Sequence, residues 1–144
     1  MHLKDVTLIA VDCVHPQLAA DALKESHKVL SFGEVVLVTS REALQTTKVT
    51  TSPETQIIVC THLDSGEKVS EFMLGELHKY AKKNHLLNIQ ADGYVRNPYA
   101  WKSSYLDYDY IGAPWKLHPH HYWPPFPNVT EENRVGNGGF SLRS

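Results

Sequence analysis

Residues 86 to 101 read Leu86-Leu-Asn-Ile-Gln-Ala-Asp-Gly-Tyr-Val-Arg-Asn-Pro-Tyr-Ala-Trp101, and this stretch divides the chain into two unlike halves. It opens as a short apolar run, breaks at Asp92-Gly93, and continues with aromatic residues and a proline. The apolar run is typical of a strand buried on both faces of a parallel sheet. A carboxylate at the carboxyl end of such a strand lies where open α/β sheets bind ligands. We therefore expect a scaffold before Asp92 and the wall of a pocket after it.

Three further apolar runs precede this stretch, at residues 6–11, 35–38 and 56–60. Between the first two, apolar residues recur at intervals of three and four, which predicts a helix that starts at Pro16 and ends at Phe32-Gly33. Its expected packing face comprises Leu18, Ala22, Leu23, Ser26, Val29 and Leu30. Residues 41–54 carry only a weak pattern, and we expect a short turn of helix and a loop there.

A second long helix is expected after residue 64. Asp64 and Glu67 fit a capping box, in which an N-cap acceptor is followed three residues later by a carboxylate. The expected packing face comprises Val69, Phe72, Met73, Leu77, Tyr80 and Ala81. Strands that alternate with helices predict an α/β fold with a mostly parallel central sheet and flanking helices. We expect a single domain, with a βαβ half over residues 1–92 and an aromatic and proline-rich half over residues 93–144.

The composition limits the kind of protein. The 144 residues carry a formal net charge of −2 and scattered basic residues, which argues against a protein that binds a nucleic-acid backbone. No apolar run approaches the ~18 residues of a membrane span, and the N-terminus lacks the apolar region of a signal peptide. A cytoplasmic location is expected. Cys13 and Cys60 do not form a disulfide framework, and we expect two reduced, buried thiols.

Aromatic residues and prolines gather in the second half. Residues 94–126 hold ten of the fourteen aromatic residues, and six of the eight prolines lie between Pro98 and Pro127. This composition predicts ordered loops around a short helix near residues 99–105, followed by a glycine-bearing strand from Val135. The aromatic rings suit stacking on a sugar or a base, but a second small core beneath the loops accounts for them equally well.

Two groups of residues in these halves are candidates for ligand binding. Asp92 could hold a divalent cation against phosphate oxygens, although Asp-Gly is also a common turn. Gly136, Gly138 and Gly139 permit positive φ angles and the close approach of a ligand, and Asn137 adds a donor and an acceptor. A hairpin or a bulge explains the same glycines. The segment is not a nucleotide P-loop, because no Gly-Lys-Ser/Thr follows.

A third group suggests a metal site only weakly. His118, His120 and His121 lie in a proline-rich loop that has no pair of cysteines at zinc spacing. Asp107 and Asp109 would share one face of an extended segment, where they are either cation ligands or an exposed edge. Together these five residues define a metal-dependent hydrolase as a minor alternative.

Several motifs resemble one family when they are taken together. They are Val6-Thr-Leu-Ile-Ala-Val-Asp-Cys13, Phe72-Met-Leu-Gly-Glu-Leu-His78, Gln90-Ala-Asp-Gly-Tyr94, Asn97-Pro98, Leu106-Asp-Tyr-Asp-Tyr-Ile-Gly-Ala-Pro-Trp115 and Val135-Gly-Asn-Gly-Gly-Phe-Ser-Leu-Arg143. The chain resembles the DUF5672 family over nearly its whole length, and that family is similar to GT-A glycosyltransferases. The resemblance implies a Rossmann-like GT-A fold that binds a nucleotide-diphospho-sugar across the carboxyl ends of the strands.

The same resemblance implies roles for individual residues. Asp92 matches the closing carboxylate of the Asp-x-Asp motif, which binds Mn²⁺ or Mg²⁺ and the donor diphosphate, while the opening position is Gln90. Asp12 and Thr39 would meet the nucleotide. The sugar and acceptor side would be lined by Trp115, Asn137, Gly138 and Gly139.

The implied function is transfer of a sugar from the donor to a glycan or another hydroxyl acceptor. In GT-A enzymes an acidic catalytic or acceptor-binding residue usually follows the glycine-bearing strand, whereas this sequence ends at Ser144. We therefore expect a fragment or an incomplete enzyme. A non-catalytic module that binds a nucleotide or a carbohydrate is the main alternative.

Overall fold

The structure is a computed structural model, and it describes residues 1–114 and 134–144. In this part of the chain, six strands form one mixed sheet in the order β3-β2-β1-β4-β6-β5. Strands β1 (His2–Val11), β2 (Ser31–Ser40), β3 (Thr55–Cys60) and β4 (His85–Ile89) pair in parallel. β5 (Tyr110–Pro114) and β6 (Val135–Arg143) complete the sheet and run antiparallel to each other, and β6 runs antiparallel to β4. The predicted α/β fold is confirmed, with an antiparallel edge added.

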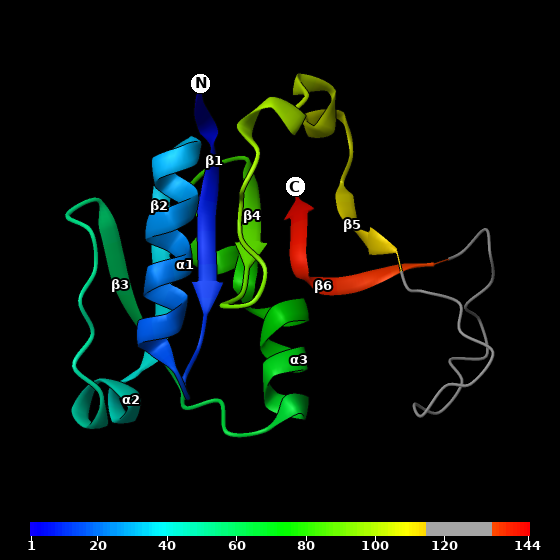
Figure 1. The fold of residues 1–144 in the computed structure, drawn as a ribbon. Coiled ribbons are helices and arrows are strands. Elements are labelled where there is room, and N and C mark those ends of the chain that lie inside the picture. Colours follow the sequence, from blue (N-terminus) through cyan, green and yellow to red (C-terminus); the bar gives the residue numbers. More distant parts are fainter. Residues whose placement is uncertain (115–133) are drawn as a thin grey trace.

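Helices cover both faces of the parallel strands (Figure 1). α1 (Pro16–Val29) lies on one face, and α3 (Gly66–Gly75) lies on the other. Each face has its own core, because side chains alternate along a strand. Leu8 and Leu37 belong to the core under α1, whereas Ile9 and Val38 belong to the core under α3. Burial on both faces explains why β1, β2 and β4 read as continuous apolar runs, whereas β3 is a partly exposed edge strand.

The first helix differs from its prediction at its end and on its face. α1 ends at Val29, and Phe32-Gly33 lies inside β2. Leu23 and Ser26 are buried as expected, but Leu18 is 54 % exposed and Val29 is 37 % exposed. The buried positions instead include Ala19 and Ala20, since the close approach of helix and sheet leaves room there only for small side chains.

The second long helix also has different ends. Its N-cap is Ser65, whose hydroxyl accepts from the Lys68 amide at 3.2 Å, so the predicted capping box at Asp64 is wrong. Asp64 instead pairs with the Lys68 ammonium group at 2.8 Å. α3 stops at Gly75, and the chain continues as a short 3₁₀ helix, η1 (Leu77–Tyr80). All six predicted face residues nevertheless pack into the core under α3.

The remaining helices are short. α2 (Arg41–Thr46) is the expected single turn in the weakly patterned region. The predicted helix near residues 99–105 is replaced by two 3₁₀ segments, η2 (Pro98–Ala100) and η3 (Ser103–Asp107). Within the described residues, none of the helices has the length and apolar character needed to span a membrane.

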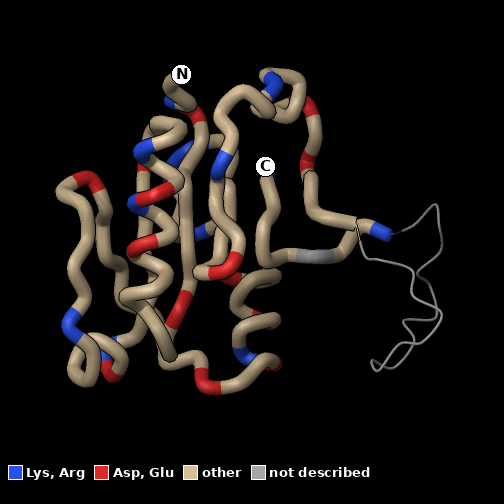
Figure 2. The backbone as a smooth tube through the Cα atoms, in the orientation of Figure 1, with Lys and Arg blue, Asp and Glu red and all other residues tan. Residues whose placement is uncertain are grey.

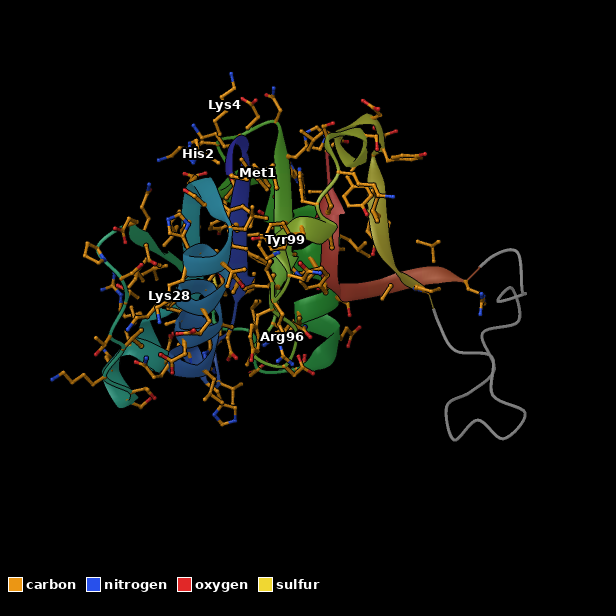
Figure 3. All side chains as sticks on the ribbon, turned by 45° about the horizontal axis from the view of Figure 1, so that its top comes forward. Met1, His2, Lys4, Lys28, Arg96 and Tyr99 are labelled. Atoms are coloured by element: carbon orange, nitrogen blue, oxygen red, sulfur yellow. The ribbon has the colours of Figure 1, made fainter. Side chains whose placement is uncertain are left out.

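Acidic and basic residues are interspersed over the described part of the backbone (Figure 2). Met1, His2 and Lys4 lie together at the amino end of β1 (Figure 3). The carboxyl ends of the four parallel strands meet at the opposite edge of the sheet, at the bottom of Figure 1. The predicted ligand-binding residues of the first half follow strands at this carboxyl edge.

Candidate functional site

The order of the strands defines a topological switch point at the carboxyl edge. From β1 the chain crosses through α1 to β2 on one side, and it later returns through α3 to β4 on the other side of β1. Adjacent strands whose connections leave in opposite directions form a topological switch point, where open α/β sheets bind ligands. Here β1 and β4 flank the switch point, and the last residues that pair between them are Ala10 and Ile89. Asp12 and Gln90 therefore follow the two strands directly at this switch point.

Asp12 is held in one orientation by the chain that follows it. Its Oδ1 accepts hydrogen bonds from the amides of Val14 at 2.8 Å and His15 at 2.6 Å. The Asp12 amide donates to the carbonyl of Val38 on β2 at 3.0 Å. This aspartate turn leads the chain into α1, and the Asp12 carboxylate provides hydrogen-bond acceptors for two amides just before that helix. Asp12 is thus both half-exposed at the switch point and a structural residue of the turn.

Gln90 and Asp92 lie in a tight turn at the end of β4. The backbones of Gln90 and Gly93 exchange two hydrogen bonds, at 3.1 and 3.3 Å. Both Gln90 and Asp92 are exposed. The conformation is therefore the turn that Asp-Gly indicates, and this turn presents the Asp92 carboxylate to solvent beside the switch point.

Thr39 and Ser40, at the end of β2, differ sharply in their partners. Thr39 is fully buried, and its hydroxyl has no hydrogen-bond partner among the described residues. A nucleotide would reach it only if neighbouring side chains moved. Ser40 accepts from the Ala43 amide at 3.1 Å, and its Oγ lies 2.7 Å from Nδ1 of His62. The sequence did not predict this partly buried pair, although Ser40 before Arg41-Glu-Ala43 is an N-cap signal.

The glycine-bearing segment forms a bulge in β6. Gly112 of β5 pairs with Ser141, but the next residue, Ala113, pairs with Asn137, so the strand register shifts between these two pairs. β6 bends sharply along its length, as Figure 1 shows. No glycine among the described residues has a positive φ, so the positive-φ reading is wrong and the bulge reading is right.

Close packing explains one of these glycines. A Cβ added to Gly138 would lie 3.0 Å from a guanidinium nitrogen of Arg143. Asn88 of β4 donates from Nδ2 to the Gly138 carbonyl at 2.8 Å, and Ser141 donates to the same carbonyl at 3.2 Å. The bulge is therefore fixed by a buried amide that belongs to the first half of the chain. Trp115, the other predicted residue of this side, lies outside the described residues.

A polar cluster lies next to the bulge on the face that α3 covers. Arg143 donates from Nε to Ser141 at 3.1 Å and from a terminal nitrogen to the Met73 carbonyl at 2.8 Å. Its guanidinium also lies 5.5 Å from the centre of the Tyr110 ring. Asn88 Oδ1 is buried without a hydrogen-bond partner among the described residues. The only sign of this cluster in the sequence is the alternation Ser141-Leu-Arg143, which places two polar side chains on the same face of a strand.

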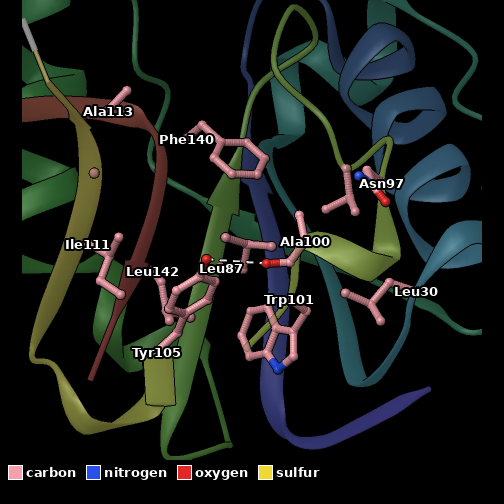
Figure 4. A pocket seen from close by; sticks show the side chains of 12 residues that line it. Leu30, Leu87, Asn97, Ala100, Trp101, Tyr105, Ile111, Ala113, Phe140 and Leu142 are labelled. Atoms are coloured by element: carbon pink, nitrogen blue, oxygen red, sulfur yellow. Dashed lines mark hydrogen bonds between the residues drawn. The ribbon is translucent and has the colours of Figure 1, made fainter. Parts of the chain in front are cut away.

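The aromatic residues that precede β5 line an apolar cavity of about 320 Å³ (Figure 4). The cavity lies over β4, β6 and β5, with Trp101 and Tyr105 on one side and Phe140 on the other. Trp101 and Tyr105 meet edge to face at 5.6 Å and pack against the core under α1. The Tyr105 hydroxyl donates to the Ala100 carbonyl at 3.2 Å and so is already used within the segment. These two rings therefore extend the core under α1 and do not form the separate second core that the sequence also allowed.

The described residues do not assemble the predicted hydrolase site. Asp109 lies at the amino edge of the sheet, where its carboxylate accepts from the Ser144 hydroxyl at 3.1 Å. Asp107 is exposed in η3. His118, His120 and His121 lie outside the described residues. Across residues 1–114 and 134–144, no three side chains of His, Cys, Asp or Glu are grouped so that they could hold a metal ion.

Cys13 and Cys60 are both free and buried, as predicted. Their sulfur atoms lie 3.8 Å apart. Burial raises the pKa of the Cys60 thiol to about 12, and the neighbouring Cys13 thiol is the second cause of this increase. This contact was not predictable from the sequence, because the cysteines lie at the ends of β1 and β3, which do not pair with each other.

The fold thus belongs to the class of open α/β sheets with helices on both faces and a switch point at the carboxyl edge. The family model described as "Protein of unknown function (DUF5672)" matches residues 54–144. The chain belongs to this family. No match was found among curated proteins or among solved structures.

Proposed function

We propose that this chain is a nucleotide-sugar-binding domain of a GT-A-like glycosyltransferase. The observation that carries the proposal is the position of Asp12 and of the Gln90–Asp92 turn, which follow the two strands on either side of the topological switch point. The bulge of β6 lies beside β4, and a Cβ at Gly93 would lie 3.7 Å from the Phe140 Cβ. Residues from both halves would therefore contribute to one site.

The geometry at Asp12 favours this class over dinucleotide-binding proteins. Dinucleotide-binding folds place a pyrophosphate on the amides at the start of the first helix, after a Gly-x-Gly-x-x-Gly turn. Here the Asp12 carboxylate already accepts hydrogen bonds from the Val14 and His15 amides, and no such glycine turn follows β1. The diphosphate would be held on the β4 side of the switch point, and Asp12 would accept hydrogen bonds from the nucleoside.

Asp92 is the residue that would hold the diphosphate through a divalent cation. A single exposed carboxylate is too few ligands to bind Mn²⁺ or Mg²⁺ alone, but such ions usually take one or two carboxylates and complete their shell with phosphate and water. The ion would offset the negative charge that develops on the departing diphosphate. Gln90 would bind the ribose, and Gly138 and Gly139 would let the sugar approach the backbone.

Binding can be tested by thermal shift with nucleoside diphosphates, each with and without Mn²⁺. A ligand at about 100 times its Kd adds about 2.7 kcal/mol of stability, which raises the Tm of a domain near this size by on the order of 5–10 °C. We expect such a shift with Mn²⁺ and its loss in Asp92→Asn. Asp5→Asn is the matched control, because Asp5 is equally exposed but lies in the amino-terminal half of β1.

The result separates the alternatives. If no nucleoside diphosphate shifts the Tm, the donor site is absent and the proposal fails. If the shift survives Asp92→Asn, the role of Asp92 is wrong. A transferase releases the nucleoside diphosphate from a sugar donor when an acceptor is added, whereas a non-catalytic module binds the donor and releases nothing.

A further inference from the structure

The two cysteines meet at the carboxyl edge although their strands are not neighbours. Cys13 is two residues beyond the end of β1, and Cys60 is the last residue of β3, with β2 between these strands in the sheet. β2 ends at Ser40, where the chain turns into α2. Beyond this end nothing separates the two thiols, and their sulfur atoms lie 3.8 Å apart.

Both thiols are packed in the same core. Cys13 is 6 % exposed and Cys60 is 9 % exposed, and both belong to the cluster of Leu63, Phe72 and Leu77 under α3. A disulfide needs a sulfur separation of about 2.05 Å, so the sulfur atoms would have to approach by only about 1.8 Å. The sequence contains no other cysteine, so only one intramolecular disulfide can form.

We propose that Cys13 and Cys60 are a site of reversible oxidation, at which a small disulfide such as oxidised glutathione converts the two thiols into an intramolecular disulfide. One cysteine loses its proton, and its thiolate attacks a sulfur of glutathione disulfide. The glutathione bond breaks, a mixed disulfide forms, and one glutathione leaves as a thiol. The second cysteine thiolate then attacks the protein-bound sulfur and displaces the other glutathione. The protein loses two protons and two electrons, and the oxidant is reduced to two thiols.

The packing favours the internal disulfide over a lasting mixed one. Glutathione bound to either cysteine would have to occupy the closely packed core under α3, whereas the second thiol already lies in contact. The raised pKa of Cys60 keeps this group protonated at neutral pH, so the reaction is slow and an equilibrium measurement is required. The resulting crosslink joins the ends of β1 and β3 beside Asp12.

The crosslink should stabilise the fold, because it joins residues separated by 47 positions in the sequence. Closing a loop of this length restricts the unfolded chain, and we expect oxidation to raise the Tm by on the order of 10 °C. The native structure should in turn stabilise the disulfide. The folded chain should therefore remain oxidised at a more reducing glutathione ratio than the chain in urea.

The test equilibrates the full chain in glutathione buffers of graded ratio, with and without urea, and quenches it with acid. Intact mass and thiol counts after denaturation should show that both thiols are lost together, with a loss of two hydrogen atoms and no bound glutathione. Dithiothreitol should restore the thiols and the lower Tm. Cys13→Ser and Cys60→Ser cannot form the internal disulfide, so each should keep its single thiol or bind one glutathione.

Three results would overturn the proposal. The first is that the wild-type chain keeps both thiols in oxidising buffer. The second is that it accumulates glutathione adducts. The third is that it forms the disulfide more readily in urea than when folded. All three are measured on the wild-type chain, so a variant that fails to fold does not affect the conclusion. None involves a nucleotide, so this test is independent of the proposed donor site.

Discussion

The two halves of the molecule are stabilised in different ways. In the first half, β1, β2 and β4 are buried on both faces, and many of their side chains have no exposed surface. In the second half, after Asp92, the buried residues are only Val95, Ser141 and Leu142 among those described. The first half builds a core on each face of the sheet, under α1 and under α3, whereas the second half is a layer against the core under α1. We expect substitutions in the first half to affect global unfolding most.

The largest effect is expected at Gly33 in β2. A Cβ there would lie 2.1 Å from the backbone oxygen of Lys4, and a backbone atom cannot move aside as a side chain can. Gly33→Ala should therefore destabilise the chain by more than about 3 kcal/mol in urea unfolding. Gly75→Ala is the control, since nothing lies within 4 Å of a Cβ at that helix end, and it should be neutral or slightly stabilising. Equal effects of the two variants would contradict the close approach of β1 and β2.

The next effect distinguishes the observed face of α1 from the predicted one. Leu23 has no exposed surface, and Leu23→Ala should cost about 3 kcal/mol through lost burial and a cavity. Leu18 was expected on the same face but is 54 % exposed, and Leu18→Ala should change stability by less than about 0.5 kcal/mol. Chemical denaturation of both variants measures the difference. Similar losses would mean that the helix packs as the sequence pattern predicted.

Asn88 tests the connection between the halves. Asn88→Ala removes the donor to the Gly138 carbonyl and should cost about 2 kcal/mol. Amide exchange should increase most in the β6 bulge, because that segment loses its link to β4. Asn84→Ala, at an exposed position before β4, is the matched control and should have little effect. A uniform increase in exchange over the whole sheet would show that the halves unfold as one unit.

A smaller effect is expected in the aromatic layer. Trp101 is half-buried and contacts Tyr105 and the core under α1, so Trp101→Ala should cost about 1.5 kcal/mol. Tyr99 is 94 % exposed and lies at the surface in Figure 3, so Tyr99→Ala should not change the Tm measurably. A loss at Trp101 as large as that at Leu23 would contradict the difference between the halves.

The smallest effects concern the start of α3. Ser65→Ala removes the N-cap hydroxyl and should cost about 1 kcal/mol, whereas Asp64→Asn should cost less. The hydrogen bond from Lys68 holds the pKa of Asp64 below its ordinary value of 3.8. The stability that the ionised Asp64 gains from Lys68 is fully present above pH 3.8, and it is lost as the pH falls through the lower pKa of Asp64 in the folded chain. An NMR titration should place the Asp64 midpoint below 3.8, and it should rise in Lys68→Ala.

Local pattern was sufficient for the elements of the first half but not for their ends. The four apolar runs predicted four strands, and burial on both faces explains the runs of β1, β2 and β4. β3 is an edge strand whose apolar residues are partly exposed. The ends of the helices and strands depend on contacts between residues that no short stretch of sequence contains. Phe32 is part of β2 because that strand pairs with β1 from Ser31 onward, and Ser65 rather than Asp64 caps α3 because its hydroxyl reaches the Lys68 amide.

The candidate site was predictable only in part. The sequence indicated that Asp12 and Asp92 follow strands, and strand order then placed them on either side of one switch point. It gave no indication that the Thr39 hydroxyl is enclosed, that Asn88 fixes the glycine bulge, or that Ser40 pairs with His62. Each of these facts joins residues from separate elements, and their distances depend on how the strands are ordered.

The sequence by itself determined the α/β class and the strands of the first half, because short apolar runs that alternate with helical patterns leave a local signature in the chain. It also determined where that pattern ends, at Asp92-Gly93. Only the tertiary structure decided that this turn lies beside β1, that Cys13 contacts Cys60, and that β6 inserts between β4 and β5. The reason is physical: the order of strands in a sheet depends on packing between segments that are distant in the chain, and no single stretch of sequence specifies that packing.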